Sequence, residues 1–504
     1  MRTQIYAGLG LFSLLIAWPA AADVDVAARE RVELTVYNQD FALIHEQRSV
    51  DLAQGVNALR LEGVAAQVDP TSVRVRSTTA PDQLRILEQN YEFDLVSYGK
   101  LLDKYIGKEV ELHETDEKTG DVRVRKATLL SSGYAIEPQP TGFGMRPAYQ
   151  YISAGQPIYE IDGKIHTQAP GRLVLPSLPQ GLILSPTLAW QLEAAKAGHH
   201  TLDLSYMTSG IKWTADYVAL LDADDAQLDL TGWVTLDNRS GAAYPDATLK
   251  LIAGDVHVIQ PPRVYAERMM MKGAADMAAP QFEERPFFEY HLYTLQRPTT
   301  VKDNEIKQVE FAGASGVAVR KRYVYDGFVV SPTYQGWDAS SYRDRPDFGA
   351  QSQPKVWVQL EFQNTAANHL GIPLPKGRVR LYKRDQNGGQ EFIGEDAIDH
   401  TPKDELVRLE AGNAFDLIGE RKQTDFRVIE PGHVVDESFD IAVRNHGERD
   451  ARVTIREHLT RGRDFEIRNP SQPFGKVDAQ TIEFDVPVPK NGRGVVSYTV
   501  RYRW

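Results

Sequence analysis

Apolar and polar residues alternate along many short segments of this chain. Segments 32–37, 73–76 and 122–125 carry an apolar residue at every second position. This alternation places the apolar side chains on one face of a β-strand and the polar side chains on the other. The pattern therefore predicts half-buried strands with one face in water.

Turn residues and one short helix separate these strands. Pairs such as Asn491-Gly492 favour tight turns, since both residues tolerate left-handed backbone angles. Helical periodicity is clear only over 94–106, where Ser97 is a suitable N-cap and Gly107 a suitable end. Short strands with frequent turns are typical of sandwiches and small barrels rather than of parallel α/β folds.

The predicted fold class is all-β, with tandem immunoglobulin-like β-sandwich units and a small inserted β-barrel that carries one short helix. The predicted units are a signal peptide at 1–22, an N-terminal β unit at 23–90, the helix with the barrel-like insertion at 91–200, a first C-terminal sandwich at 201–345 and a second at 346–504. A long loop at about 260–288 carries four of the seven methionines. We expect a flexible connection there; an adaptable apolar contact surface is the alternative.

Three strands of the predicted C-terminal region, 201–504, end in the same way. Each one stops at an asparagine that a small polar turn follows, and these residues are Asn238, Asn364 and Asn445. Asparagine suits a strand end because its side chain bonds the local backbone. The repetition supports a series of sandwich units.

The N-terminus has the composition of a secretory signal peptide. Arg2 precedes an apolar run over 5–17, and the three alanines at 20–22 suit a signal peptidase. We expect cleavage after Ala22 and a mature chain that starts at Asp23, with an uncleaved anchor as the alternative. The mature chain shows no segment suited to a transmembrane helix. The predicted location is therefore periplasmic or outer-membrane-associated, with the protein in soluble form.

Composition and charge exclude several kinds of site and several classes of protein. The 504 residues include no cysteine, which excludes disulfides, thiolate metal sites, cysteine nucleophiles and a lipidated cysteine anchor. The net charge of −12 argues against a nucleic-acid-binding protein, which would carry a basic surface. The 42% of hydrophobic residues excludes global disorder.

Segments spread over nearly the whole mature chain carry a family resemblance. They are VYNQD at 36–40, EGVAAQVDPTSV at 62–73, LLDKYIGKEV at 101–110, WTADY at 213–217, DHTPKDE at 399–405, IEFDVPVP at 482–489 and YRW at 502–504. Together they resemble the bacterial domain of unknown function 4139, which is related to mucoidy inhibitor A. The resemblance implies an exported or envelope protein rich in β-structure and supplies no catalytic residues. The chain departs from the mucoidy inhibitor in lacking a long heptad helix.

One acidic cluster has residue types that suit a metal. No standard catalytic or nucleotide-binding motif occurs in the sequence. Asp222, Asp224 and Asp225 offer hard oxygen ligands at the short spacing that Ca²⁺ accepts. The calcium-loop pattern is not met, and a solvated hairpin turn is the alternative interpretation. We expect no cofactor.

A second acidic cluster has residue types that suit acid–base catalysis. Glu395 and Asp399 are paired carboxylates, and His400 follows them directly. Carboxylates beside a histidine can transfer protons to and from a substrate. A charged hairpin loop is the alternative interpretation of this segment.

Aromatic residues of a long loop are the candidate ligand contacts. Trp337, Tyr334 and Tyr342 lie at about 331–354, where exposed rings could stack on a glycan. The closing segment 495–504 alternates apolar and polar residues up to a final Trp504. It resembles the last strand of an outer-membrane barrel, and the alternative is a last sandwich strand with one buried face.

The leading hypothesis is an exported envelope protein that binds or scaffolds another molecule. The expected partner is an envelope protein or a glycan, and not a nucleic acid. A carboxylate-based hydrolase acting on envelope glycan is the alternative, and an outer-membrane-associated β protein is the second alternative. No pattern specifies an oligomeric state.

Overall fold

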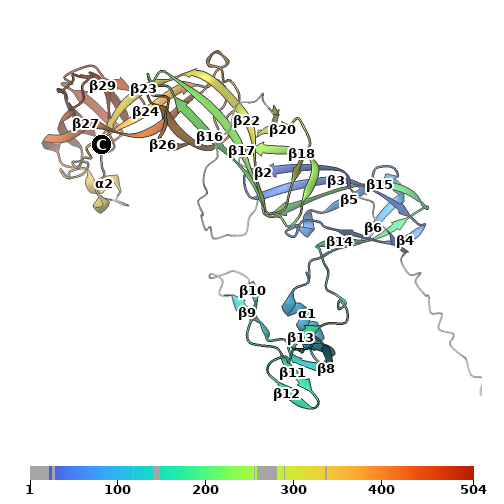
Figure 1. Ribbon diagram of the computed structural model, residues 1–504. Coiled ribbons are helices and arrows are strands. Elements are labelled where there is room, and N and C mark those ends of the chain that lie inside the picture. The colour runs from blue at the N-terminus through green and yellow to red at the C-terminus, as the bar shows by residue number, and fades with distance from the viewer. Residues whose placement is uncertain are drawn as a thin grey trace, which may run out of the picture.

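The chain folds almost entirely into β-sheets. The computed structural model describes residues 22–24, 29–116, 118–139, 148–254, 256–257, 281–288, 290–334, 336 and 338–504. Within these ranges the α-helices are α1 (Tyr98–Tyr105) and α2 (Ala339–Tyr342), and four single 3₁₀ turns occur at Pro70–Ser72, Pro81–Gln83, Pro332–Tyr334 and Ala366–Asn368. The all-β class with sandwich-like sheets is confirmed. Figure 1 shows these sheets in an elongated row with one smaller unit projecting to the side.

An eight-stranded and a four-stranded sheet form the N-terminal part. The larger sheet has the order β19 (Phe282–Phe287), β20 (Tyr290–Leu295), β18 (Tyr244–Ala253), β2 (Arg29–Tyr37), β3 (Phe41–Leu52), β15 (Gly198–Ser209) and β5 (Arg74–Ser77), with β21 (Thr299–Val301) paired to β18. The smaller sheet has the order β1 (Ala22–Val24), β4 (Gly55–Glu62), β14 (Thr187–Ala194) and β6 (Leu84–Glu92). Trp190 and Leu59 of the smaller sheet are buried in one core with Leu204 of the larger.

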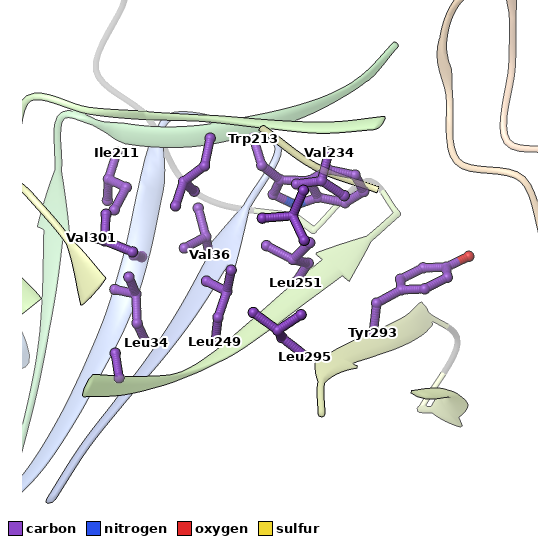
Figure 2. Packing of buried hydrophobic residues seen from close by; sticks show 14 of the residues in the cluster. Leu34, Val36, Ile211, Trp213, Val234, Leu249, Leu251, Tyr293, Leu295 and Val301 are labelled. Carbon is purple, nitrogen blue, oxygen red and sulfur yellow. The ribbon is translucent and has the colours of Figure 1, made fainter. Parts of the chain in front are cut away.

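A five-stranded sheet covers the other part of the eight-stranded sheet. Its order is β22 (Glu305–Ala318), β17 (Gln227–Asn238), β16 (Ile211–Leu221), β25 (Gly377–Arg384) and β26 (Gln390–Ile398). Figure 2 shows the apolar side chains that the two sheets direct at each other, including Leu34, Leu249 and Trp213. The Trp213 indole donates a hydrogen bond to the Ile252 carbonyl at 3.2 Å, so its polar atom is satisfied in the core.

A nine-stranded sheet forms the C-terminal part. Its order is β30 (Asp464–Arg468), β33 (Arg493–Arg503), β28 (Val434–Asn445), β27 (Leu406–Glu430), β24 (Lys355–Gln363), β23 (Arg320–Asp326), β29 (Ala451–His458), β32 (Thr481–Val488) and β31 (Gly475–Lys476). The sheet curls over its own core, in which Ile441 and Tyr498 meet Ile455 and Phe484. The closing strand β33 is therefore a sandwich strand with one buried face, as the second interpretation of that segment predicted.

One long strand belongs to two cores. β27 has 25 residues. Leu409 near its start is buried with the N-terminal sheets, whereas Leu417 is buried in the C-terminal core. A continuous strand can join two sandwiches in this way because its pairing partner changes from β24 to β28 along its length.

The insertion between β6 and β14 has a small core of its own. It contains α1 and the strands β7 (Glu109–Thr115), β8 (Val122–Ser131), β9 (Tyr134–Gln139), β10 (Ala148–Ser153), β11 (Ile158–Ile161), β12 (Lys164–His166) and β13 (Arg172–Val174). Leu102 and Tyr105 of α1 pack with Leu112, Leu129 and Tyr159 of the strands. Ser97 caps the helix by accepting a hydrogen bond from the Lys100 amide, as its sequence position predicts.

The prediction of a closed barrel in this insertion is wrong. The strands β12, β11, β8, β7 and β13 form an open sheet, and β9 pairs with β10 in a separate hairpin. The edge strands β12 and β13 have three residues each. Strands this short give little length for a closing ladder, and α1 covers the apolar face of the sheet in place of closure.

The repeated asparagines have the same role in all three places. Asn238, Asn364 and Asn445 are buried at the ends of their strands or just after them. Each donates through Nδ2 to two backbone carbonyls and accepts a backbone N–H through Oδ1. The repeat seen in the sequence is therefore a repeated turn structure.

Two predicted segments can be compared with the structure only over a few of their residues. The signal peptide, apart from Ala22 in β1, and most of the methionine-rich loop lie outside the described residues. The end of the predicted loop forms strand β19. Among the described residues, no helix has the length and apolar character that crossing a membrane requires.

Candidate functional site

A charged groove lies on the face of the eight-stranded sheet that points away from its core. It is open to solvent, has a volume of about 350 Å³ and receives side chains from five strands, β18, β2, β3, β15 and β5. Figure 1 shows that these strands come from distant parts of the chain. Its lining residues are Glu33, Thr35, Leu43, His45, Arg74, Arg76, Asp203, Ser205 and Lys250. We call this surface the sheet groove.

Strand alternation explains why these side chains share one face. Leu34 and Val36 of β2 and Ile44 of β3 point into the core and are fully buried. Their neighbours Glu33 and His45 therefore point to the opposite face. The sheet groove is thus the wet side of strands whose dry side forms the largest core.

Strand register brings four of the lining residues into a single row. Glu33 is paired with His45 across β2 and β3. His45 is paired in turn with Ser205 of β15, and Ser205 with Arg74 of β5. Directly opposed residues on neighbouring strands have Cβ atoms roughly 4.5–5.5 Å apart. The row therefore presents a carboxylate, an imidazole, a hydroxyl and a guanidinium side by side.

Ion pairs fix several side chains of the sheet groove. The Lys250 Nζ atom lies 2.5 Å from Glu33 Oε2. Asp203 accepts a hydrogen bond from Arg76 Nε at 2.8 Å and shares another with His45 Nε2. These contacts hold the charged ends in place before any ligand arrives.

Both carboxyls of the sheet groove favour their ionised forms. Burial opposes ionisation of Asp203, but the hydrogen bonds of His45 and Arg76 outweigh it and lower the pKa of that carboxyl. Burial also opposes ionisation of Glu33, and the nearby Lys250 ammonium lowers its pKa overall. Two fixed anions therefore lie among the cations.

Cations exceed anions in the sheet groove. Lys250 neutralises Glu33, and Arg76 neutralises Asp203. Arg74 is exposed and forms no ion pair with any residue that the structure describes. The sheet groove therefore offers one unmatched guanidinium in a chain whose net charge is −12. Such a guanidinium suits a carboxylate, sulfate or phosphate group of a ligand.

The predicted acid–base residues lie near the end of β26, away from the sheet groove lining. Glu395 is within the strand, and its Oε2 lies 3.9 Å from Arg380 Nε. Asp399 follows the strand with a side chain 92% exposed, and its Oδ1 lies 3.6 Å from Lys376 Nζ. His400 accepts a hydrogen bond from the Lys376 amide through Nδ1 at 3.2 Å. The two carboxylates thus face different cations.

The predicted metal ligands lie in the turn between β16 and β17. Asp222 accepts a hydrogen bond from the Ala226 amide and so stabilises the turn, and Asp224 is exposed. Asp225 is held between the ammonium groups of Lys321 and Lys383. Burial opposes ionisation of Asp225, yet these lysines lower its pKa. The described ranges contain no cluster of three or more histidine or acidic side chains that could hold a metal ion.

The predicted aromatic contacts help to build their own loop. Tyr342 stacks on Phe348 with ring centroids 3.9 Å apart, and Tyr334 meets the same ring edge-on at 5.4 Å. The Tyr334 hydroxyl donates to Asp347 Oδ2 at 2.5 Å. Trp337 lies outside the described residues. The two tyrosines therefore contribute to the structure of the loop around Phe348.

A buried charge network holds this loop against the C-terminal sandwich. Arg421 donates to both carboxylate oxygens of Glu457, and Glu457 accepts the Tyr498 hydroxyl. Arg461 forms an ion pair with Glu437 at 2.5 Å. Arg461 also donates to four carbonyls of the loop, those of Tyr342, Arg343, Arg345 and Phe348. A narrow cleft of about 10 Å³ lies between these groups.

Sequence reasoning missed both charged features. The alternation of 73–76 indicates that Arg74 and Arg76 lie on a solvent-facing strand face, and these are two of the three lysine and arginine residues that line the sheet groove. Arg421 lies four residues after Leu417 on the same strand, so the two buried side chains point to the same face. An arginine at an inward position of an alternating strand is the signal that could have found the buried network.

Comparison with known proteins gives one family. The model of the domain of unknown function DUF4139 matches residues 202–504. The matched region includes Asp203, Ser205 and Lys250 of the sheet groove, and the strands β2, β3 and β5 precede it. No curated protein matches this chain.

Proposed function

Since the chain belongs to the family of the domain of unknown function DUF4139, whose description gives no activity, we propose its function from its own surfaces. It is an exported protein of the cell envelope that binds or scaffolds another molecule. The binding surface is the sheet groove. The immunoglobulin-like sandwich units are the rigid frame that presents it.

The observation that carries this proposal is the set of fixed charges in the sheet groove. Paired residues such as Lys250 with Glu33 and Arg76 with Asp203 lose little freedom when a ligand binds, because they are already ordered. Arg74 adds a guanidinium that no described residue neutralises. A concave surface with a few fixed polar groups is the usual form of a binding site.

The N-terminal sequence supports export. Arg2, the apolar run over 5–17 and the alanines at 20–22 have the order of a secretory signal. Cell fractionation with mass spectrometry of the N-terminus tests this part of the proposal. A processed chain that starts at Asp23 in the periplasmic fraction supports it, and an unprocessed cytoplasmic chain contradicts it. Recovery in the outer-membrane fraction would favour the outer-membrane-associated alternative.

Affinity capture tests the binding role. The tagged mature protein is incubated with envelope extract beside two variants, Arg74→Glu in the sheet groove and Arg123→Glu on the exposed face of β8. The expected result is a component that the wild type and the Arg123→Glu protein retain and the Arg74→Glu protein loses. Equal retention by all three proteins, or no retained component, contradicts a binding role for the sheet groove.

The alternative proposal is a carboxylate-based hydrolase acting on envelope glycan. It rests on Glu395, Asp399 and His400, which lie within 395–400 near the end of β26. The double substitution Asp399→Ala and His400→Ala tests it. Loss of glycan-degrading activity, with capture by the sheet groove unchanged, would support the hydrolase over the binding protein.

A further inference from the structure

We propose that the ligand of the sheet groove is an acidic glycan, held with its anionic group at Arg74. This inference rests on the proposed binding function and adds the chemical class of the ligand. The anionic group is a carboxylate or a sulfate or phosphate ester, since a guanidinium binds all three through paired N–H donors.

The position of Arg74 favours an anionic group at one side of the sheet groove. Arg74 lies on β5, the edge strand of the sheet, and is paired in register with Ser205. The Ser205 hydroxyl can donate to an anion that the Arg74 guanidinium binds. Arg76 lies two residues further along the same strand, where its charge is paired with Asp203, so Arg74 is the cation that is left for a ligand.

The remaining lining residues suit the hydroxyl groups of a sugar. Glu33 and Asp203 are ionised carboxylates, which accept hydrogen bonds from hydroxyls. Lys250 and Thr35 can donate hydrogen bonds; they are paired in register across β18 and β2, and Lys250 also contacts Glu33. A sugar hydroxyl both donates and accepts, so a surface of alternating donors and acceptors matches a chain of sugars.

The same lining argues against a peptide ligand. Leu43 is the single apolar side chain among the nine lining residues. Peptide-binding and protein-binding sites usually carry large apolar or aromatic anchors. The strands β2, β3 and β15 under the sheet groove each have a partner strand on both sides. The free edge of the sheet at the sheet groove is that of β5, which has four residues and gives an extended peptide little length for pairing.

Binding of defined polymers to the full mature protein tests the inference. The probes are polygalacturonate, which carries carboxylates, dextran sulfate, which carries sulfate esters, neutral dextran and poly-glutamate. We expect at least one acidic polysaccharide to bind at least about tenfold more tightly than neutral dextran and poly-glutamate. Comparison of the two acidic polysaccharides distinguishes a carboxylate from a sulfate-type ligand.

Two substitutions connect this binding to the sheet groove. Arg74→Glu should weaken binding of the preferred polysaccharide at least about tenfold, because it replaces the unmatched cation by an anion. Arg123→Glu makes the same charge change on an exposed position of β8 and should leave binding unchanged. Ser205→Ala should weaken binding without any change of net charge. Equal melting temperatures of the variants would show that folding is retained.

Three outcomes overturn the inference. They are the absence of binding to both acidic polysaccharides, unchanged binding by the Arg74→Glu protein, and binding of poly-glutamate as tight as that of the polysaccharides. The capture experiment separates these failures from failure of the proposed function. If the captured component is an envelope protein and its capture depends on Arg74, the proposed binding function stands and the acidic glycan is ruled out as the ligand.

Discussion

Arg461 and Glu437 form an ion pair whose side chains are 1% and 4% exposed. The guanidinium also donates to the Phe348 carbonyl at 2.9 Å, so one buried side chain joins strand β28 to the loop that carries α2. A buried charge without a partner is strongly destabilising, whereas a pair with satisfied hydrogen bonds is tolerated. The loop is therefore attached to the sandwich by groups that depend on each other.

The Arg461→Ala substitution should destabilise this part of the protein by about 3–5 kcal/mol, because Glu437 loses its buried cationic partner and keeps the Gln423 side-chain amide as a donor, while four loop carbonyls each lose a hydrogen bond. Hydrogen exchange of the β28 amides measures the free energy of opening. Arg463 is exposed in the same turn, and Arg463→Ala is the control with little expected change. Similar protection of β28 in both variants would contradict a stabilising role for the buried pair.

The Asn364→Ala substitution should lower the free energy of unfolding by about 2 kcal/mol or more. Asn364 is fully buried, donates to the carbonyls of Ile372 and Pro402 and accepts the Gly371 amide. Denaturant unfolding followed by circular dichroism measures the change. Asn387→Ala is the matched control in an exposed turn. If Asn364→Ala lowers the free energy of unfolding no more than the control does, other contacts hold the turn.

Local signals in the sequence predicted the parts of the fold that depend on local chemistry. The strand-ending Asn364 and the helix cap Ser97 could be predicted because each bonds backbone within a few residues or at a strand end. The sheet groove could not be predicted, since Lys250 and Glu33 meet across 217 positions of sequence. Which strands become neighbours decides that contact, and alternation alone does not specify strand order.

The same limit applies to the acidic cluster that the sequence offers as a candidate metal site. The sequence places Asp225 close to Asp222, and that proximity suggested a metal site. The fold instead brings Lys321 and Lys383 to Asp225 from two other strands, which gives the carboxylate cationic partners. The open sheet of the insertion has a similar origin, because no local pattern distinguishes an open sheet from a closed one.

The stability contributed by His458 should decrease as pH rises. The hydrogen bond to Asp326, at 2.8 Å, raises the pKa of His458, and burial opposes this shift less strongly. A histidine whose pKa in the folded protein lies above its unfolded value of about 6.5 contributes its full stabilising free energy below that pH. The contribution is then lost as pH rises through the folded pKa.

Thermal unfolding of the wild type and the His458→Gln protein at pH 5.5 and pH 8.5 checks this prediction. The melting temperature of the wild type should exceed that of the variant by more at pH 5.5 than at pH 8.5, because a larger fraction of the molecules holds the charged pair at the lower pH. Asp326→Asn should give the same pattern, since it removes the other partner. A difference between wild type and variants that is constant or grows with pH would refute the assignment.

The insertion should be removable without unfolding the sandwiches. Strands β6 and β14 are direct partners, with Glu92 paired to Thr187, and the insertion has its own core around Leu102. Replacing residues 94–185 by Asn-Gly would join the two strands through a short hairpin turn, for which this pair is well suited. The shortened protein should keep its strand content by circular dichroism and its cooperative thermal transition, and it should still bind the ligand of the sheet groove.

Replacing the same residues by a single glycine is the control, since a connection that short should strain the hairpin. Aggregation of both proteins, or loss of protection at β14 amides in the Asn-Gly protein, would show that the sandwiches need the insertion to fold.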